Sequence, residues 1–168
     1  VDVLCYGDST GALGASISGG APPYDFELSD DATSVNIDSV TDTLGLTYGY
    51  TGLPAGSYTI TATDANNNSQ SITIVITEPA SPISLTLTSS DYNGFNISCF
   101  GADDGWISIL PSGGGGTENI NNYTIQWTLN GQPYSLNENS TTIDLVGLGP
   151  GLYSVLVTDE VGCEYSES

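Results

Sequence analysis

The sequence predicts an all-β protein built of two tandem antiparallel β-sandwich repeats, and three observations support this fold class. Apolar and polar residues alternate along several short segments, as they do in strands with one buried face. Clusters of Gly, Asn, Asp, Ser and Pro separate these segments at short intervals, which is typical of turns between short strands. One phrase also occurs twice, as "GLPAGSYTITATDANNNSQ" at 52–70 and as "GLGPGLYSVLVTDEVGCEY" at 147–165.

The alternating segments place the expected strands along the chain. Their apolar positions are Tyr24, Phe26 and Leu28; Tyr58, Ile60 and Ala62; Ile72, Ile74 and Ile76; Ile107 and Ile109; Tyr123, Ile125 and Trp127; Tyr153, Val155 and Val157. No segment has the apolar period of a helix. Because sandwich domains place a core aromatic on the corresponding strand, we expect Trp127 to be buried.

The internal repetition extends over most of the chain. Residues 5–20, "CYGDSTGALGASISGG", match residues 99–114, "CFGADDGWISILPSGG", and the second copy then adds an insertion at 115–122. Each copy is long enough for a seven-strand sandwich of the immunoglobulin type. We therefore expect two tandem immunoglobulin-like repeats, 1–79 and 80–168. Two prolines in the joining segment "TEPASP" interrupt strand pairing and stiffen the linker.

The repeated phrase itself has a structural interpretation. Tyr58 and Tyr153 each begin a late strand just after a Gly-rich turn, which predicts a tyrosine corner with the hydroxyl bonded to nearby backbone. Asp64 and Asp159 open the hairpin turns "DANNN" and "DEVGC", where Asp, Asn and Gly supply turn hydrogen bonds.

Each repeat lacks a strand that the other has. Residues 83–90 form an expected first strand of the second repeat, but "VDVLC" is too short to form its counterpart in the first. Residues 71–79 form an expected last strand of the first repeat, and the second stops at "CEYSES". An unpaired sheet edge over an open core recruits strands. We therefore expect the chain to be a segment of a longer protein. The missing strands would come from flanking chain or from a neighbouring molecule.

The composition excludes several classes of partner. The 168 residues include 20 acids and no Lys, Arg or His, for a net charge of −20. Nucleic acid is excluded because cationic side chains supply the affinity for phosphate, and a bare anionic membrane repels the chain for the same reason. No apolar run is long enough to span a bilayer, and the N-terminus lacks the pattern of a signal peptide, so any export signal must lie outside this segment.

The acids have no basic side chains with which to pair. Bulk salt, bound cations or protons must neutralise them, which makes a divalent metal a candidate partner. The alternative is a solvated acidic surface that keeps the protein soluble.

Taken together, the motifs resemble a known family. "CFGADDGWI", "SGG", "YTIQW", "GLGPGLYSVLVTDEVGC" and "ITEP" are similar to the SprB-type repeat of giant cell-surface adhesins in gliding bacteria of the Bacteroidota. The resemblance covers nearly the whole chain in two copies. It implies export to the cell surface, commonly by the type IX secretion system, and a role in adhesion and surface motility.

The resemblance also implies a disulfide. The family pattern pairs the positions of Cys99 and Cys163, and a disulfide suits an oxidising compartment. In the first copy Asn68 stands where the second cysteine belongs, so Cys5 is expected to be a buried free thiol. A catalytic role for this thiol is not expected, because the chain has no His to activate it.

The implied disulfide would bring acidic residues together at one end of the second sandwich. The expected set is Asp103, Asp104, Asp159 and Glu160, with the thinner set Asp8 and Asp64 in the first repeat. Carboxylate oxygens of this kind suit Ca²⁺, which takes six to eight oxygen ligands. In the alternative interpretation, Asp64 and Asp159 cap turns while Asp103 and Asp104 face water.

Glycosylation sites are a further implication of the resemblance. Bacteria of that phylum modify Ser or Thr that follows Asp and precedes an apolar residue or Thr. Ser9, Ser39 and Thr43 fit this pattern.

We predict a non-enzymatic, structural and adhesive segment of a long extracellular protein or filament of tandem β-sandwich repeats. Its partners are flanking repeats, neighbouring copies in a fibre, or surface glycans. One alternative is a carbohydrate-binding module with an aromatic platform, for which the candidates are Trp106, Tyr48, Tyr50 and Tyr134. Another is a subunit of a strand-exchanged fibre. A glycosidase is not expected, because the adjacent acids Asp30 and Asp31 point in different directions.

Overall fold

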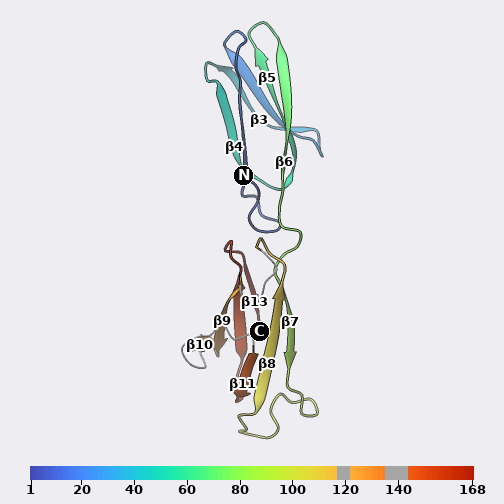
Figure 1. Ribbon diagram of the computed structural model, residues 1–168, viewed down its shortest axis with the longest axis vertical. Coiled ribbons are helices and arrows are strands. Elements are labelled where there is room, and N and C mark those ends of the chain that lie inside the picture. Colours follow the sequence, from blue (N-terminus) through green and yellow to red (C-terminus); the bar gives the residue numbers. More distant parts are fainter. Residues whose placement is uncertain (117–121, 135–143) are drawn as a thin grey trace. The chain divides into compact units, whose positions relative to one another are not determined.

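The computed structural model describes residues 1–116, 122–134 and 144–168. The chain forms two compact units, Val1–Pro79 and Ala80–Ser168, which divide where the two repeats join. Part of the predicted insertion at 115–122 lies outside the described residues. The elements that the structure describes are strands, so the all-β fold class is confirmed (Figure 1). Within the described ranges, no helix is long and apolar enough to cross a membrane.

The first unit consists of two antiparallel sheets. The smaller sheet pairs β1 with β4, and the larger has the order β3-β2-β5-β6. The strands are β1 (Gly11–Ser16), β2 (Tyr24–Asp30), β3 (Val35–Thr43), β4 (Thr47–Leu53), β5 (Gly56–Asp64) and β6 (Ser69–Ile76). Side chains from both sheets meet in one core, in which Phe26, Leu28 and Ile60 are almost fully buried.

The second unit repeats this arrangement with one strand added. Its sheets have the orders β11-β8-β7 and β10-β9-β12-β13. The strands are β7 (Ser84–Ser89), β8 (Gly105–Ser112), β9 (Thr124–Leu129), β10 (Gln132–Tyr134), β11 (Asp144–Leu148), β12 (Tyr153–Thr158) and β13 (Glu164–Glu167). Strand β7 is the addition, since β8 corresponds to β1 and each later strand to its counterpart in chain order.

Strand registers support this correspondence. Leu28 of β2 faces Ile60 of β5 in the first unit, and Trp127 of β9 faces Val155 of β12 in the second. Trp127 is 5% exposed, which confirms the predicted core aromatic.

The first three residues cover part of the edge that the sequence predicted to be open. The backbone of Val1 exchanges two hydrogen bonds with that of Ala12 in β1, at 2.7 and 2.9 Å. Val3 donates to the carbonyl of Thr77, just after β6, at 2.9 Å, and its side chain is buried. A short N-terminal segment thus bridges the two sheets at one end of the first unit. Farther along β1, an open slot remains between β1 and β6, bordered by Ala15 and Ile72.

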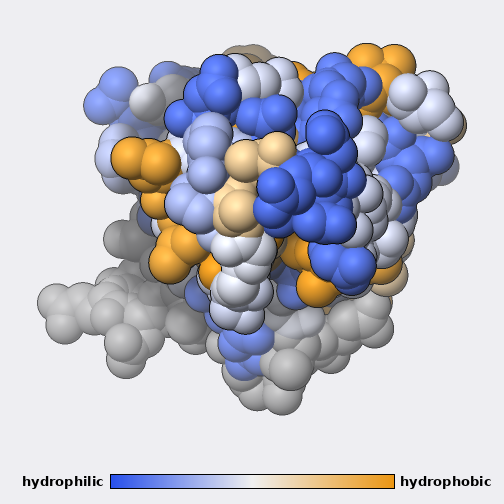
Figure 2. All heavy atoms as spheres, turned by 90° about the horizontal axis from the view of Figure 1, so that it is seen from above, coloured by the Kyte–Doolittle hydropathy of each residue, from blue (hydrophilic) through white to orange (hydrophobic). Residues whose placement is uncertain are grey.

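The surface mixes hydrophilic residues with separate apolar ones. Figure 2 shows hydrophilic residues, in blue, over much of the face that it draws, interrupted by orange patches. Such a surface is consistent with a chain of net charge −20.

Candidate functional site: repeated turns and a cleft in the second unit

A buried carboxylate organises the β5–β6 turn of the first unit. The Oδ1 atom of Asp64 accepts hydrogen bonds from the backbone N–H groups of Asn66 and Asn68, both at 2.9 Å. Its Oδ2 atom accepts from the N–H of Ala21, ahead of β2, at 3.1 Å. The N–H of Asn68 and then its side-chain amide stabilise the charged form, so the pKa of Asp64 is lowered although burial opposes the shift. Asp64 therefore ties a hairpin turn to a loop distant in sequence.

Asp159 makes the same connection in the second unit. Its Oδ1 accepts from the N–H groups of Val161 and Cys163, at 3.0 and 2.8 Å, and its Oδ2 accepts from that of Gly115 at 2.8 Å. Both aspartates are 7% exposed. The predicted turn role is confirmed for Asp64 and Asp159, and their carboxylate oxygens are occupied by backbone donors.

Both predicted tyrosine corners are present. The hydroxyl of Tyr58 donates to the carbonyl of Pro54 at 3.0 Å, and that of Tyr153 donates to the carbonyl of Gly149 at 3.2 Å. Each bond joins the start of a late strand to the Gly-rich turn before it. The repeated phrase therefore encodes a turn and its anchor in both units.

A second pair of tyrosines makes a repeated bond that sequence reasoning missed. The hydroxyl of Tyr24 donates to the carbonyl of Gly19 at 2.9 Å, and that of Tyr123 to the carbonyl of Gly113 at 2.6 Å. A double glycine precedes the tyrosine in both repeats, but Tyr24 follows Gly19 by 5 residues and Tyr123 follows Gly113 by 10, so the insertion hid the correspondence. Both glycines of each pair have positive φ, a backbone conformation that glycine adopts without strain.

The predicted convergence of four acids in the second unit is wrong. Asp103 and Asp104 precede β8, and Oδ1 of Asp104 accepts from the N–H of Ser98 at 3.0 Å. Asp159 and Glu160 instead lie against the glycines that follow β8. The eight residues of β8 separate the two pairs by about 23 Å, at about 3.3 Å per residue.

Asp8 and Asp64 are also separated in the first unit. Asp8 lies in the loop before β1, whereas Asp64 bonds to Ala21 beyond the other end of that strand. Among the residues that the structure describes, no group of three or more His, Cys, Asp and Glu is placed to hold a metal ion. Calcium binding stays a prediction, although the acids that were expected to bind the ion together lie apart.

The disulfide assignment also needs correction. Cys99 is an exposed free thiol, while Cys5 and Cys163 are disulfide-bonded. The expected Cys99–Cys163 bond and the free thiol at Cys5 are therefore wrong. The reason lies in the second unit: Cys99 is in the loop leading into β8, at the end of the sandwich where β12 begins. Cys163 is buried beyond the other end of β12.

The predicted glycosylation positions differ in accessibility. Ser9 is exposed in the loop before β1, and Ser39 is exposed on β3 opposite Glu27. Thr43 is half-buried, and its Oγ1 atom accepts a hydrogen bond from the N–H of Gly45 at 3.0 Å. Modification at the three positions stays a prediction.

The candidate aromatic platform is not assembled in the first unit. Tyr48 is buried and stacks on Phe26 with ring centroids 5.5 Å apart. Its hydroxyl donates to Asp38 at 2.8 Å, and burial, followed by this carboxylate, raises the pKa of Tyr48. Tyr50 packs, partly buried, against the same core. Both tyrosines therefore stabilise the sandwich.

In the second unit the two aromatic candidates differ. Tyr134 packs edge-on against Tyr153, with ring centroids 5.4 Å apart. Trp106 is 40% exposed on β8 and lies opposite Val146 of β11, which is 63% exposed. Trp106 is therefore available to a ligand.

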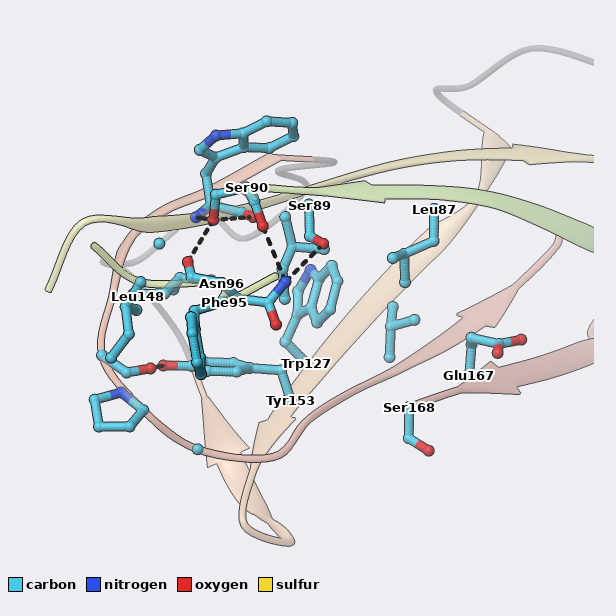
Figure 3. Close-up of a pocket in the computed structure, with 18 of the residues that line it drawn as sticks. Leu87, Ser89, Ser90, Phe95, Asn96, Trp127, Leu148, Tyr153, Glu167 and Ser168 are labelled. Carbon is cyan, nitrogen blue, oxygen red and sulfur yellow. Dashed lines mark hydrogen bonds between the residues drawn. The ribbon is translucent and has the colours of Figure 1, made fainter. Parts of the chain in front are cut away.

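A cleft of about 500 Å³ opens between the two sheets of the second unit. Figure 3 shows Leu87 of β7 on one side of the cleft and Glu167 of β13 with the following Ser168 on the other, and Trp127 and Tyr153 farther along it. Its lining is mainly apolar. A hollow of this composition suits the binding of an apolar partner.

Hydrogen bonds at one end of the cleft hold the loop that precedes β8. The hydroxyl of Ser90 donates to the carbonyl of Asn96 at 2.6 Å and accepts from the N–H of Trp106 at 3.0 Å. The side-chain amide of Asn96 donates to Ser89 Oγ at 3.1 Å and to the carbonyl of Ser90 at 2.9 Å. These polar groups hydrogen-bond to one another and so hold the loop in place at this end of the cleft (Figure 3).

Comparison with protein families supports the resemblance drawn from the sequence. Residues 1–33 match the family model described as the SprB repeat. A search of curated proteins found no match to the chain.

A search of solved structures found several chains with a similar arrangement. Fibronectin(III)-like modules of Clostridium thermocellum CbhA are 12% identical, with 95% of this chain and 83% of that chain covered, at a TM-score of 0.37. A two-domain fibronectin type-III segment of chicken tenascin is 14% identical, with 99% of this chain and 95% of that chain covered, at a TM-score of 0.34. Three N-terminal domains of the bacteriophage RB49 outer capsid protein Hoc are 16% identical, with 97% of this chain and 55% of that chain covered, at a TM-score of 0.41. The fold assignment rests on the strand order described above.

Proposed function

We propose that the chain is a non-enzymatic, structural and adhesive segment of an extracellular cell-surface protein built of tandem β-sandwich repeats. The observation that carries the proposal is that the shared side chains serve the framework. Asp64 and Asp159 tie turns to distant loops, and Tyr58 and Tyr153 anchor strands to turns. When a duplicated unit keeps the side chains that stabilise its own fold, the result is a longer structure of the same kind.

The segment acts mechanically in this proposal. Each unit resists extension through antiparallel strand pairing and through the apolar core that its two sheets share. Its partners are flanking repeats of the same protein or neighbouring copies in a filament. The match of residues 1–33 to the SprB repeat supports this role.

The acidic composition suits a protein exposed at the cell surface. The sequence contains no Lys or Arg, so it presents no site to trypsin-like proteases. Its net charge of −20 also repels other acidic surfaces at low ionic strength. Adhesion therefore depends on contacts that act at short range.

Antibodies raised against the chain test both the location and the adhesive role. They should label intact cells of the source and, as monovalent fragments, reduce attachment of those cells to a surface. Fragments from non-immune serum provide the control. Labelling that appears only after the cells are permeabilised would contradict the extracellular assignment. Normal attachment at saturating labelling would contradict the adhesive one.

Carbohydrate binding is a second candidate, favoured by the exposed indole of Trp106. Aromatic side chains that lie open on a sheet can stack on the apolar faces of sugar rings. A glycan array probed with the wild-type chain and with Trp106→Ala tests it. Loss of a wild-type signal in the variant would support this candidate. The structural proposal expects no specific signal from either protein.

A further inference from the structure

We propose that Asn93, in the loop that precedes β8, is a site of spontaneous deamidation. The backbone nitrogen of Gly94 attacks the side-chain carbonyl carbon, Cγ, of Asn93, and the Cγ–Nδ2 bond breaks as ammonia leaves. The amide proton of Gly94 departs with the ammonia, and a succinimide ring remains. Water then opens the ring at either carbonyl group, so that Asn93 becomes aspartate or isoaspartate. This modification goes beyond the proposed function, since it needs no partner protein.

The sequence alone does not distinguish Asn93 from one other asparagine. The dipeptide Asn–Gly occurs twice in the chain, at Asn93–Gly94 and at Asn130–Gly131. Glycine after asparagine favours the reaction, because no Cβ hinders the attacking nitrogen and the backbone turns freely. Both asparagines also have positive φ, 59° for Asn93 and 51° for Asn130. Any difference in their reactivity therefore comes from their surroundings in the fold.

Asn130 is held by a neighbouring segment of the chain. It lies with Gly131 in the turn between β9 and β10, where Leu129 pairs with Gln132. Its Oδ1 atom accepts a hydrogen bond from the N–H of Leu152 at 3.1 Å, and its own N–H donates to the carbonyl of Leu152 at 2.8 Å. Rotation of the side chain toward the nitrogen of Gly131 would break the first of these bonds. The fold therefore protects Asn130.

The side chain of Asn93 is not held in this way. It is exposed and makes no hydrogen bond within the described residues. The space beside Gly94 is open, since a Cβ built on this glycine would meet no atom beyond its chain neighbours within 4 Å. The side chain of Asn93 can therefore rotate toward the nitrogen of Gly94 without losing a hydrogen bond.

A carboxylate lies against the nitrogen that must react. The N–H of Gly94 donates to Oδ1 of Asp91 at 2.6 Å. The N–H of Tyr92 donates to the carbonyl of Phe95 at 2.7 Å, which closes the turn around Asn93 and Gly94. The nitrogen of Gly94 attacks as its proton is lost, and a base within hydrogen-bond distance can take that proton. Asp91 is therefore placed to accept the proton and to pass it to the leaving ammonia.

Deamidation would change one end of the cleft in the second unit. Gly94, Phe95 and Asn96 line that end. A new carboxylate in place of the Asn93 amide adds to the charge of the nearby Asp91, and isoaspartate also lengthens the backbone by one carbon atom. We therefore expect the hydrogen bond from Tyr92 to Phe95 to weaken in the isoaspartate product.

The test follows the intact, folded chain during incubation at neutral pH and physiological temperature. Fragmentation mass spectrometry locates the mass increase of deamidation, and an isoaspartate-specific methyltransferase detects the isoaspartate product. We expect Asn93 to convert at least about tenfold faster than Asn130, because Asn130 must break a hydrogen bond and Asn93 has a base beside its attacking nitrogen. Equal rates at the two asparagines, or faster conversion of Asn130, would overturn the proposal.

Unfolding the chain in urea tests whether the fold sets this difference. In the unfolded chain both asparagines precede glycine, and neither Asp91 nor Leu152 is held in place beside them. The two asparagines should then convert at similar rates. A difference that persists in urea would show that local sequence sets the rates, and it would overturn the structural basis of the proposal.

Two variants test the role of Asp91. Asp91→Ser keeps an oxygen that can accept from Gly94 but removes the base, and should slow conversion of Asn93 about threefold or more. Asp103→Ser is the matched control, because it removes another exposed acid of the same loop. Tryptophan fluorescence checks that both variants fold, since both tryptophans lie in the second unit. An unchanged rate in Asp91→Ser, or equal slowing in both variants, would overturn the role of Asp91 as the base.

Discussion

At the scale of single residues, the two turn aspartates show how a chain without basic side chains can bury carboxylates. The carboxylate of Asp64 or Asp159 accepts hydrogen bonds from backbone N–H groups of the hairpin turn that follows it. These bonds replace the water lost on burial, and at Asp64 they lower the pKa of the carboxyl group. Neither carboxylate needs a basic side chain, and the sequence contains none.

Asp64→Asn should destabilise the first unit at pH 7, because an amide nitrogen in place of Oδ2 cannot accept from Ala21. The pKa of Asp64 is lowered in the folded state, so its stabilising effect is present above its ordinary value of 3.8 and disappears as pH falls through the folded value. The difference in Tm between wild type and variant should therefore shrink below about pH 4. Asp8→Asn, which removes the charge of an exposed acid, is the control. A difference independent of pH would contradict this role.

Cys99 should be the cysteine that reacts with a thiol reagent in the native, non-reduced chain, because it is exposed and free. Mass mapping should place the label on Cys99, and Cys99→Ser should abolish labelling without changing the Tm. Label on Cys5 or Cys163 would show that the disulfide assignment is incorrect.

At the scale of elements, alternation predicted the strands whose inward residues are large. It placed β2, β5, β9 and β12 through their Tyr, Phe, Ile and Trp positions, and those residues form the cores. Strand β1 was not predicted from its own pattern, because "GALGAS" has small residues that carry little periodic signal. Strand β3 was missed because its residues are mostly exposed, so no buried face appears in its pattern.

The candidate site was less predictable than the strands. The turn roles of Asp64 and Asp159 follow from local sequence, and the structure confirms them. The acid cluster depended on a disulfide between Cys99 and Cys163, which local sequence does not determine. Because β8 carries the chain from one end of the sandwich to the other, residues next to Cys99 and residues next to Cys163 lie far apart.

Tyr153→Phe should lower the free energy of unfolding of the second unit by about 0.5–1.5 kcal/mol, because it removes one hydrogen bond between a strand and its preceding turn. Tyr58→Phe should have a similar effect on the first unit. Chemical denaturation followed by tryptophan fluorescence should detect Tyr153→Phe alone, since both tryptophans lie in the second unit. Tyr6→Phe, at an exposed position, is the control. An effect of Tyr58→Phe on the fluorescence transition would show that the two units do not unfold independently.

At the scale of the whole molecule, repulsion among carboxylates opposes folding. With 20 acids and no basic side chains, electrostatic stabilisation comes from hydrogen bonds and from the salt around the protein. Raising NaCl from 0.01 to 0.15 M shortens the screening length from about 30 Å to about 8 Å and should raise the Tm of both units. An unchanged Tm would contradict this view. A larger rise with CaCl₂ at matched ionic strength would indicate that carboxylates bind calcium.

Single-molecule stretching of the intact chain tests most directly whether it is a structural pair of sandwiches. With the chain held between handles at its two ends under reducing conditions, we expect two separate unfolding events. Each event should release an extended length of about 300 Å, as expected for roughly 80 to 90 residues. Gradual lengthening without discrete events, or one event that releases the whole chain, would contradict the claim that each repeat is an independent mechanical unit.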